Sequence, residues 1–213
     1  MKIFWDVDTQ IDFMNEDGRL PVPDAHEIRH NLKKLTQYAV NNKIKLIKSM
    51  DYHIEYDKEI SDTPDFKTTF PMHCEEGSIG ACFIRETTPS YSSTYMVNYN
   101  NPLLTSIDIL ENDVIVIRKN KFDVFEGNHW TEGILNFIDP LKEAMIYVYG
   151  VAIDVCVDFA VMGNLKHGRK VFPVVDAMRG INNDVAYNSN LLRKWIDNGA
   201  ICVSTKEILK GWV

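Results

Sequence analysis

The sequence predicts an α/β protein with a three-layer, Rossmann-like fold: a central, mostly parallel six-stranded sheet covered by helices on both faces. Short runs of β-branched and aromatic residues alternate along the chain with amphipathic segments of helical period. This alternation is typical of a parallel sheet. The chain has 213 residues, of which 45% are hydrophobic. That is enough for one substantial core, so we expect one domain over residues 1–213.

The first half of the chain supplies two strands and one helix. Residues 3–7 form a β-rich apolar run that we expect to be the first strand. In residues 25–41 apolar side chains recur at helical spacing on one face, which predicts a helix. Residues 44–47 are the expected second strand. Residues 51–112 are polar and weakly periodic, and a loop region of that size is usually functional or partly disordered.

The second half returns to regular alternation. The expected strands are residues 114–118, 145–149, 171–175 and 201–203. The expected helices are residues 132–138, 154–166, 183–197 and 206–209. Gly168 and Gly199 end two of these helices, because glycine suits the left-handed position after a helix.

Composition excludes several classes of protein. The net charge is −7 and the pI is about 5.4, without a basic stripe, so we expect no nucleic-acid partner. The 4 cysteines form no CxxC pair or dense framework, which favours reduced thiols in a cytoplasmic protein. No apolar stretch is long enough to span a membrane, and the first residues are too soon charged for a signal peptide.

Reactive or ionisable side chains follow four of the expected strands. Asp8 follows the first strand, Asp51 the second, Lys119 the third and Cys156 the fourth. Sites in a parallel α/β sheet form beyond the carboxyl ends of the strands. We therefore expect a nucleophile, carboxylates and a cation to meet at one edge of the sheet.

Cys156 is the candidate nucleophile. It follows an apolar strand and a glycine, and it falls in the first turn of the next expected helix. Free N–H groups at a helix start favour negative charge, ease ionisation of a thiol and can hold an oxyanion. The alternative is that Cys156 is a small buried hydrophobe, as most free cysteines are.

Asp51, His53 and His73 are candidate metal ligands. Asp51 and His53 are two residues apart, so in an extended chain they project to the same side. Two imidazoles and a carboxylate suit Zn²⁺, Fe²⁺ or Mn²⁺, with positions left for water or substrate. A lone histidine is by default a surface or hydrogen-bonded residue, and we interpret the other four in that way: His26, His30, His129 and His167.

Motifs spanning nearly the whole chain resemble the isochorismatase-like cysteine hydrolases, and among them the nicotinamidases (pyrazinamidases). Residues 8–13 read DTQIDF against D-x-Q-x-D-F, and residues 50–53 read MDYH against R-D-x-H. Residues 70–74 read FPMHC against W-P-x-H-C, and Lys119 ends the lysine motif. Residues 150–157 read GVAIDVCV against G-V-A-T-D-x-C-V, and residues 176–180 read DAMRG against D-A-x-R-G.

The resemblance implies a catalytic triad of Asp8, Lys119 and Cys156. It also implies a cis peptide bond between Val151 and Ala152, and an oxyanion hole formed by the N–H groups of Ala152 and Cys156. The activity implied is hydrolysis of nicotinamide to nicotinate and ammonia through a thioester, by attack on a linear amide C–N bond.

The resemblance further implies a metal site and a substrate pocket. The metal ligands would be Asp51, His53 and His73, binding one divalent ion, with zinc expected first and iron or manganese as alternatives. The ion would hold the pyridine nitrogen of the substrate. The expected substrate-binding residues are Phe13, Phe70 and Val151. We expect a small-molecule amide substrate and a homo-oligomer.

Several residues depart from the family pattern. Phe70 stands for a tryptophan, and Ile153 for a threonine. Asp6 interrupts a strand that is normally apolar. Asp57 or Glu59 lies where some relatives carry an additional metal-binding histidine. These departures leave two other hypotheses open: a related amidase for another small amide or ureido compound, and a non-catalytic metal-binding protein on this fold.

Overall fold

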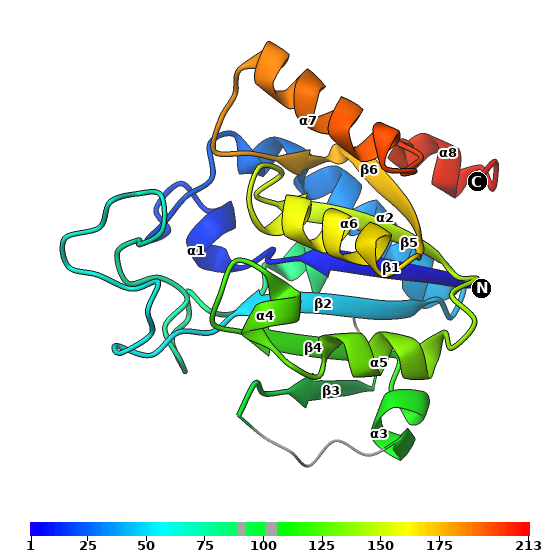
Figure 1. Cartoon of the computed structure of the whole chain (residues 1–213), viewed down its shortest axis with the longest axis horizontal. Helices are drawn as coiled ribbons and strands as arrows, with labels where there is room; N and C mark the ends of the chain where they lie inside the picture. The colour runs from blue at the N-terminus through cyan, green and yellow to red at the C-terminus, as the bar shows by residue number, and fades with distance from the viewer. Residues whose placement is uncertain (89–92, 101–105) are drawn as a thin grey trace.

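A computed structural model describes residues 1–88, 93–100 and 106–213, and within these it contains one six-stranded sheet (Figure 1). The order of the strands is β3-β4-β2-β1-β5-β6, and all neighbouring pairs are parallel. Their bounds are β1 Lys2–Val7, β2 Lys45–Asp51, β3 Thr94–Val97, β4 Val114–Lys119, β5 Met145–Val151 and β6 Lys170–Arg179. The predicted α/β class with a central parallel sheet is confirmed.

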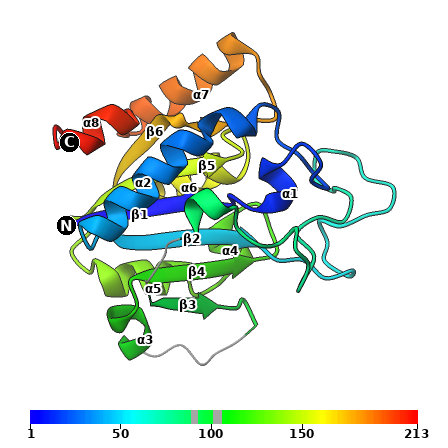
Figure 2. The same cartoon turned by 180° about the vertical axis from the view of Figure 1, so that it is seen from behind.

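Helices cover both faces of this sheet. Figures 1 and 2 show α2 on one face and α4, α5 and α6 on the other. The α-helices are α1 Ile11–Met14, α2 Arg29–Asn41, α3 Ser106–Glu111, α4 Val124–Gly127, α5 Thr131–Ile138, α6 Cys156–Lys166, α7 Val185–Asp197 and α8 Thr205–Leu209. Two 3₁₀ turns, η1 Ala25–Ile28 and η2 Arg85–Thr87, complete the described elements. No described helix has the length and apolarity needed to cross a bilayer.

Two hydrophobic clusters fill the spaces between the layers. On the α2 face, Phe4 and Tyr147 of the sheet pack with Leu32 of α2. On the other face, Trp5 and Val148 pack with Val157 of α6. Adjacent residues of β1 thus bury side chains on opposite faces, as the pleat of a strand requires. The central strands are buried on both sides, which explains their continuous apolar sequence.

The sixth strand of the sheet is not the predicted one. Residues 201–203 form only an isolated bridge, between Val203 and Val174. Ile201 donates to Val171 and Val203 donates to Pro173, but Pro173 has no N–H to continue the parallel ladder between these two bonds. The actual sixth strand is β3, at the other edge, within the stretch predicted as loop. That stretch also includes residues 89–92 and 101–105, which lie outside the described residues.

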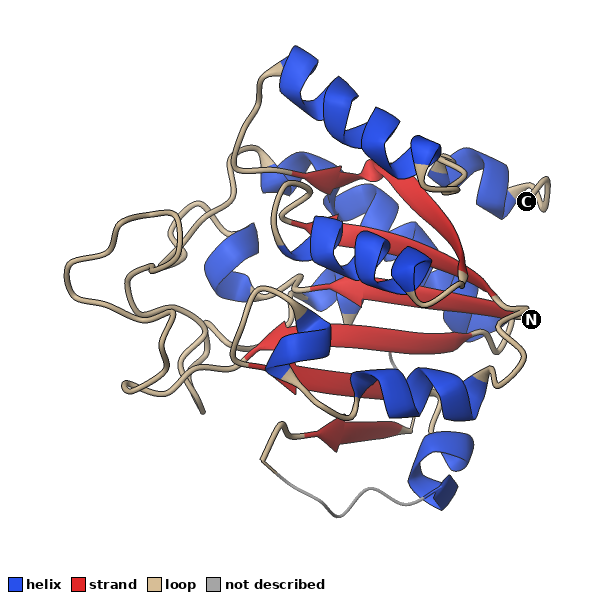
Figure 3. Ribbon diagram, in the orientation of Figure 1, coloured by secondary structure: helices blue, strands red, loops and turns tan. Residues whose placement is uncertain are grey.

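The helix boundaries differ from the predictions by a few residues. The helix predicted at residues 25–41 begins as η1 and becomes α2 at Arg29. The helix predicted from residue 154 begins at Cys156. In Figure 3 the carboxyl ends of the strands point to the side of the molecule where the long loop connections gather.

Candidate active site

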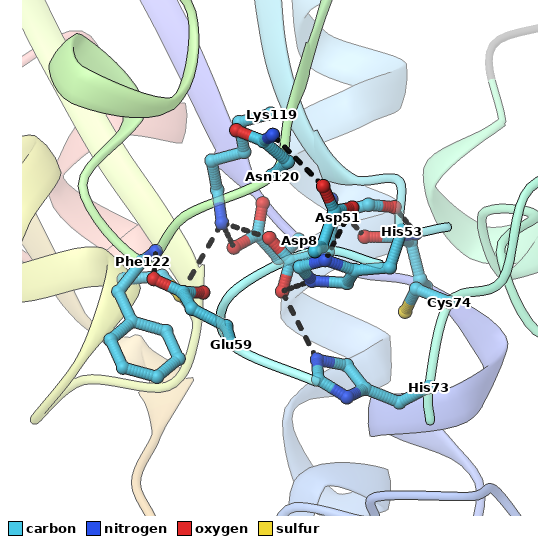
Figure 4. A network of polar contacts seen from close by, with 12 residues as sticks. Asp8, Asp51, His53, Glu59, His73, Cys74, Lys119, Asn120 and Phe122 are labelled. Atoms are coloured by element: carbon cyan, nitrogen blue, oxygen red, sulfur yellow. Dashed lines mark hydrogen bonds and ion pairs between the residues drawn. The ribbon is translucent and has the colours of Figure 1, made fainter. Parts of the chain in front are cut away.

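Four neighbouring strands bring the predicted site residues together. Asp51 is the last residue of β2, and Lys119 is the last residue of β4. Asp8 directly follows β1, and Cys156 opens α6 shortly after β5. Because these strands are adjacent in the order β4-β2-β1-β5, their ends meet at one edge of the sheet. Figure 4 shows Asp8, Asp51 and Lys119 close together there.

Lys119 lies at the centre of the group. Its Nζ is 3.0 Å from Asp8 Oδ2 and 3.6 Å from Cys156 Sγ. It also contacts Asp51 Oδ1. Asp8 and Lys119 are fully buried, and Cys156 is 7% exposed. The Asp8 carboxylate is held by its ion pair with Lys119, and its contacts with the Lys119 ammonium and the Cys156 thiol both act against the rise in pKa that burial causes.

Burial dominates the protonation of these groups. Burial raises the pKa of Asp8, against the opposing effect of Lys119. Burial also raises the pKa of the Cys156 thiol well above its usual value, although Lys119 acts in the opposite direction. Burial would lower the pKa of Lys119, but Asp51 and Asp8 more than offset it and raise that pKa. Burial thus outweighs the easier ionisation predicted from the helix start and favours the neutral thiol.

The turn before α6 exposes two backbone donors. The peptide bond between Val151 and Ala152 is cis, as the resemblance implied. The Ala152 carbonyl accepts from the N–H groups of Val155 and Val157. No acceptor among the described residues pairs with the N–H of Ala152 or of Cys156. The start of α6 therefore offers two free N–H groups next to the thiol.

Asp51, His53 and His73 form a compact buried cluster whose candidate ligand atoms, one from each residue, all lie within 4.8 Å of one another. The Nε2 atoms of His53 and His73 are 3.8 and 3.7 Å from Asp51 Oδ2. Burial would raise the pKa of Asp51, but Lys119 and the two imidazoles hold it well below its usual value. The group thus presents a carboxylate and two imidazole nitrogens around one point.

The outer contacts of the two histidines fit a metal site. His73 Nδ1 lies 2.7 Å from the Pro71 carbonyl, to which it can donate, which leaves the Nε2 lone pair for an ion shared with Asp51. His53 is fully buried, yet neither ring nitrogen has a hydrogen-bond partner among the described residues. A divalent ion bound by Nε2 would satisfy this buried atom. A carboxylate at the other ring nitrogen commonly orients a metal-binding imidazole.

Asp57 and Glu59 lie near this cluster in different ways. Asp57 Oδ2 is 3.3 Å from His53 Nδ1, the ring nitrogen away from the cluster, which is the place of a carboxylate that orients a metal-binding imidazole. Glu59 Oε1 accepts from the Phe122 N–H at 3.0 Å, while Oε2 is buried without a hydrogen-bond partner. Burial raises the pKa of Glu59 from 4.5 to about 7. Figure 4 shows Glu59 beside Phe122.

A cavity of about 170 Å³ adjoins both the thiol and the metal cluster. Cys156 and Ala152 line it, and so do Asp51 and His73. The predicted substrate residues all lie in its wall: Phe13, Phe70 and Val151. Six further wall residues were not predicted: Leu20, Pro21, Val22, Phe66, Val155 and Ile181.

Phe122 also lines the cavity, and sequence reasoning missed its role. It lies three residues beyond Lys119, and its ring packs against Phe70 with centroids 5.5 Å apart. The available signal was its position just after Lys119, where the chain leaves the strand end beside the site. The other wall residues come from separate loops, and nothing local in the sequence marks them.

Gln10 connects the turn that carries Asp8 with the strand end that carries Asp51. Its side-chain amide donates to the Asp51 carbonyl at 2.7 Å and accepts from the Asp51 N–H at 2.8 Å. It also donates to the Ala81 carbonyl at 3.0 Å. Gln10 therefore fixes the end of β2 relative to the turn that carries Asp8, a role that sequence reasoning did not assign.

No protein-family model matches the chain. The nicotinamidase of Saccharomyces cerevisiae is 21% identical over 207 residues, covering 86% of this chain and 90% of the yeast protein. A solved pyrazinamidase from Pyrococcus horikoshii, in complex with zinc, is 22% identical with a TM-score of 0.73, covering 95% of this chain and 98% of that one.

Two further solved structures share the fold. An isochorismatase-like hydrolase from Alkaliphilus metalliredigens has a TM-score of 0.75 at 18% identity, with 100% of each chain covered. The N-carbamoylsarcosine amidase of Thermoplasma acidophilum has a TM-score of 0.70 at 19% identity, covering 96% of this chain and 97% of that one. These similarities confirm the resemblance to the isochorismatase-like hydrolases at the level of the fold.

Proposed function

We propose that this chain is a metal-dependent cysteine amidohydrolase that converts nicotinamide to nicotinate and ammonia. The observation that carries the proposal is one small cavity that is lined by residues of two groups. Cys156, with Asp8 and Lys119 behind it, borders the cavity, and Asp51 and His73 of the metal cluster also line it. The similarity to proteins described as nicotinamidase and pyrazinamidase supports the same activity.

In the first half of the reaction, Asp8 takes the proton from the Cys156 thiol. Its raised pKa makes it a better base than an exposed carboxylate, and one of its oxygens lies within 4.8 Å of the Cys156 sulfur. The sulfur forms a bond to the carboxamide carbon, and the carbonyl electron pair moves to the oxygen. The free N–H groups of Ala152 and Cys156 are placed to hold this oxyanion.

The oxyanion then collapses to a thioester. The C–N bond breaks as Asp8 returns its proton to the nitrogen, and ammonia leaves. Asp8 next accepts a proton from water, whose oxygen attacks the thioester carbon. The C–S bond breaks to give nicotinic acid, and Asp8 returns the proton to Cys156. The acid leaves as nicotinate after losing its own proton to the solvent. Lys119 stays charged throughout, because Asp51 and Asp8 raise its pKa, and it offsets the negative charge on Asp8 or on the sulfur.

The cavity suits a flat, uncharged ring. An apolar cavity of about 150 Å³ in another protein binds benzene, and the cavity here is about 170 Å³ with aromatic and aliphatic walls. A divalent ion held by Asp51, His53 and His73 would supply a ligand position for the ring nitrogen. No Lys or Arg is among the wall residues that the structure describes, so the walls themselves offer no cation for a carboxylate substrate.

The second candidate is a related amidase for another small amide or ureido compound. The fold similarity to an N-carbamoylsarcosine amidase favours it as much as it favours a pyrazinamidase. Sarcosine carries a carboxylate, however, for which the described wall residues supply no Lys or Arg, so only a bound ion could pair with it. Ammonia release from nicotinamide, pyrazinamide and amides without a ring nitrogen tests the two. Turnover of a ureido acid without any turnover of nicotinamide would contradict our proposal.

A further inference from the structure

A second buried charge pair lies in the sheet, outside the cavity wall. Asp6 of β1 and Lys48 of β2 are register partners, and their side chains contact each other. Each residue is 1% exposed. Asp6 is also the residue that interrupts an otherwise apolar strand. A buried ion pair is often no more stabilising than an apolar pair of similar size, so its other contacts point to what it does.

Those contacts converge on Thr9. Asp6 Oδ2 accepts a hydrogen bond from the Thr9 hydroxyl at 2.9 Å, and that hydroxyl is 2.8 Å from the hydroxyl of Thr87. Lys48 Nζ donates to the Thr87 carbonyl at 2.7 Å. The Thr9 carbonyl accepts from the Ile84 N–H at 3.0 Å. Thr9 is thus held through both its side chain and its main chain.

Thr9 directly follows the proposed base. Asp8 has a positive φ of 49°, and its carbonyl accepts from the Gln10 N–H at 2.7 Å, so the chain turns sharply there. The Asp8 carboxylate is held by the ion pair with Lys119, and its contacts with Lys119 and the Cys156 thiol act against the rise in pKa that burial causes. Its main chain is held by the N–H bond to the Ser49 carbonyl at 3.2 Å and by the turn that Thr9 continues, so a shift of this turn would move the carboxylate.

We propose that Asp6, paired with Lys48, is a positioning residue that holds the Asp8 carboxylate toward Cys156 through the Thr9 hydroxyl. The inference rests on the proposed function, in which Asp8 is the base. Neither Asp6 nor Lys48 lines the cavity, so their effect falls on the chemical step and not on substrate binding. The hydrogen bond from Thr9 to Asp6 transmits this effect.

The test replaces the pair together, because removal of one partner would leave the other as an unpaired buried charge. The variant Asp6→Leu/Lys48→Met keeps similar volume but removes the acceptor of Thr9. In the zinc-loaded, folded enzyme we expect kcat for nicotinamide to fall by about tenfold to a hundredfold, since small misplacements of a reacting group are costly. KM and zinc content should stay near those of the wild type.

Thr9 provides the matched controls. Thr9→Val removes the hydroxyl and should lower kcat by a similar factor, whereas Thr9→Ser keeps the hydroxyl and should retain most of kcat. Adding Thr9→Val to Asp6→Leu/Lys48→Met should cause little further loss, because all three changes break one connection. If the paired variant fails to fold, the comparison of Thr9→Val with Thr9→Ser decides the question.

Three results would overturn the inference alone. The first is a folded, zinc-loaded Asp6→Leu/Lys48→Met enzyme with kcat within about twofold of the wild type. The others are losses of kcat that add independently in the combined variant, and equal losses of kcat in Thr9→Val and Thr9→Ser. A wild-type enzyme that releases no ammonia from nicotinamide would overturn the proposed function as well. Residual ammonia release by Cys156→Ala would also overturn the proposed function. Failure of the proposed function and failure of the positioning role of Asp6 therefore give different results.

Discussion

Lys119 donates a hydrogen bond to Asp51, and this contact joins the proposed triad to the proposed metal site. Asp51 uses Oδ1 for Lys119 and directs Oδ2 toward the two histidines. The same ammonium group is 3.0 Å from Asp8. One buried cation therefore compensates carboxylates that belong to two functions, and we expect the two functions to be coupled.

Lys119→Met should abolish nicotinamide turnover and also weaken zinc binding. Removal of the cation leaves Asp8 and Asp51 as neighbouring buried carboxylates, which raises their pKa values and makes protons compete with the metal. Zinc content after dialysis and ammonia release measure the two effects. Lys121→Met, at an exposed lysine nearby, is the matched control. Normal zinc affinity in Lys119→Met would show that the sites are independent.

Asp8→Asn should slow the chemical step by on the order of a hundredfold or more, because the amide keeps the shape but cannot accept a proton. Single-turnover ammonia release measures this step. Asp17→Asn changes an exposed carboxylate in the same way and should leave the rate unchanged. Near-normal kcat in Asp8→Asn would rule out the proton route proposed here.

Chelation, or His53→Ala, should severely reduce nicotinamide hydrolysis. Benzamide has the same ring shape and amide without the ring nitrogen, so it should be a poor substrate already and lose little more. The exposed His129→Ala variant controls for loss of a histidine as such. Equal hydrolysis of the two amides by zinc-loaded enzyme would show that the ion does not select the substrate.

Glu59 should make stability fall with rising pH relative to Glu59→Gln. Burial raises its pKa in the folded chain from 4.5 to about 7, so between these values unfolding releases a proton. The free energy of unfolding of the wild type should therefore decrease, relative to Glu59→Gln, as pH rises through this window, and level off above it. Urea unfolding of the metal-free chain measures this difference, and Glu126→Gln is the exposed control. Parallel pH curves for wild type and Glu59→Gln would contradict the prediction.

The grouping of the candidate site could be predicted because it depends on strand ends. Asp8, Lys119 and Cys156 each follow an apolar strand, and the carboxyl ends of parallel strands share an edge. The walls of the cavity are different. Phe66 and Ile181 come from loops distant in the sequence, and only tertiary packing brings them to one cavity.

Predictions from local sequence patterns were also wrong where a single backbone group decided whether a segment joins the sheet, or where burial decided how a side chain is protonated. The missing N–H of Pro173 keeps residues 201–203 out of the sheet. β3 is short, and only Val97 in it is buried, so it lacks the apolar pattern of a central strand. The protonation of Cys156 depends on burial by distant residues, which its position at a helix start does not reveal. The homo-oligomer expected from the sequence stays a prediction.

The central claim is that Cys156 forms a thioester with the acyl group of nicotinamide. Mass spectrometry of zinc-loaded enzyme, quenched in acid during turnover, tests it most directly. The account predicts a nicotinoyl group on the peptide that contains Cys156, no such group on Cys74, Cys82 or Cys202, and neither adduct nor ammonia release in Cys156→Ala. An adduct on another cysteine, or ammonia release by Cys156→Ala, would contradict it.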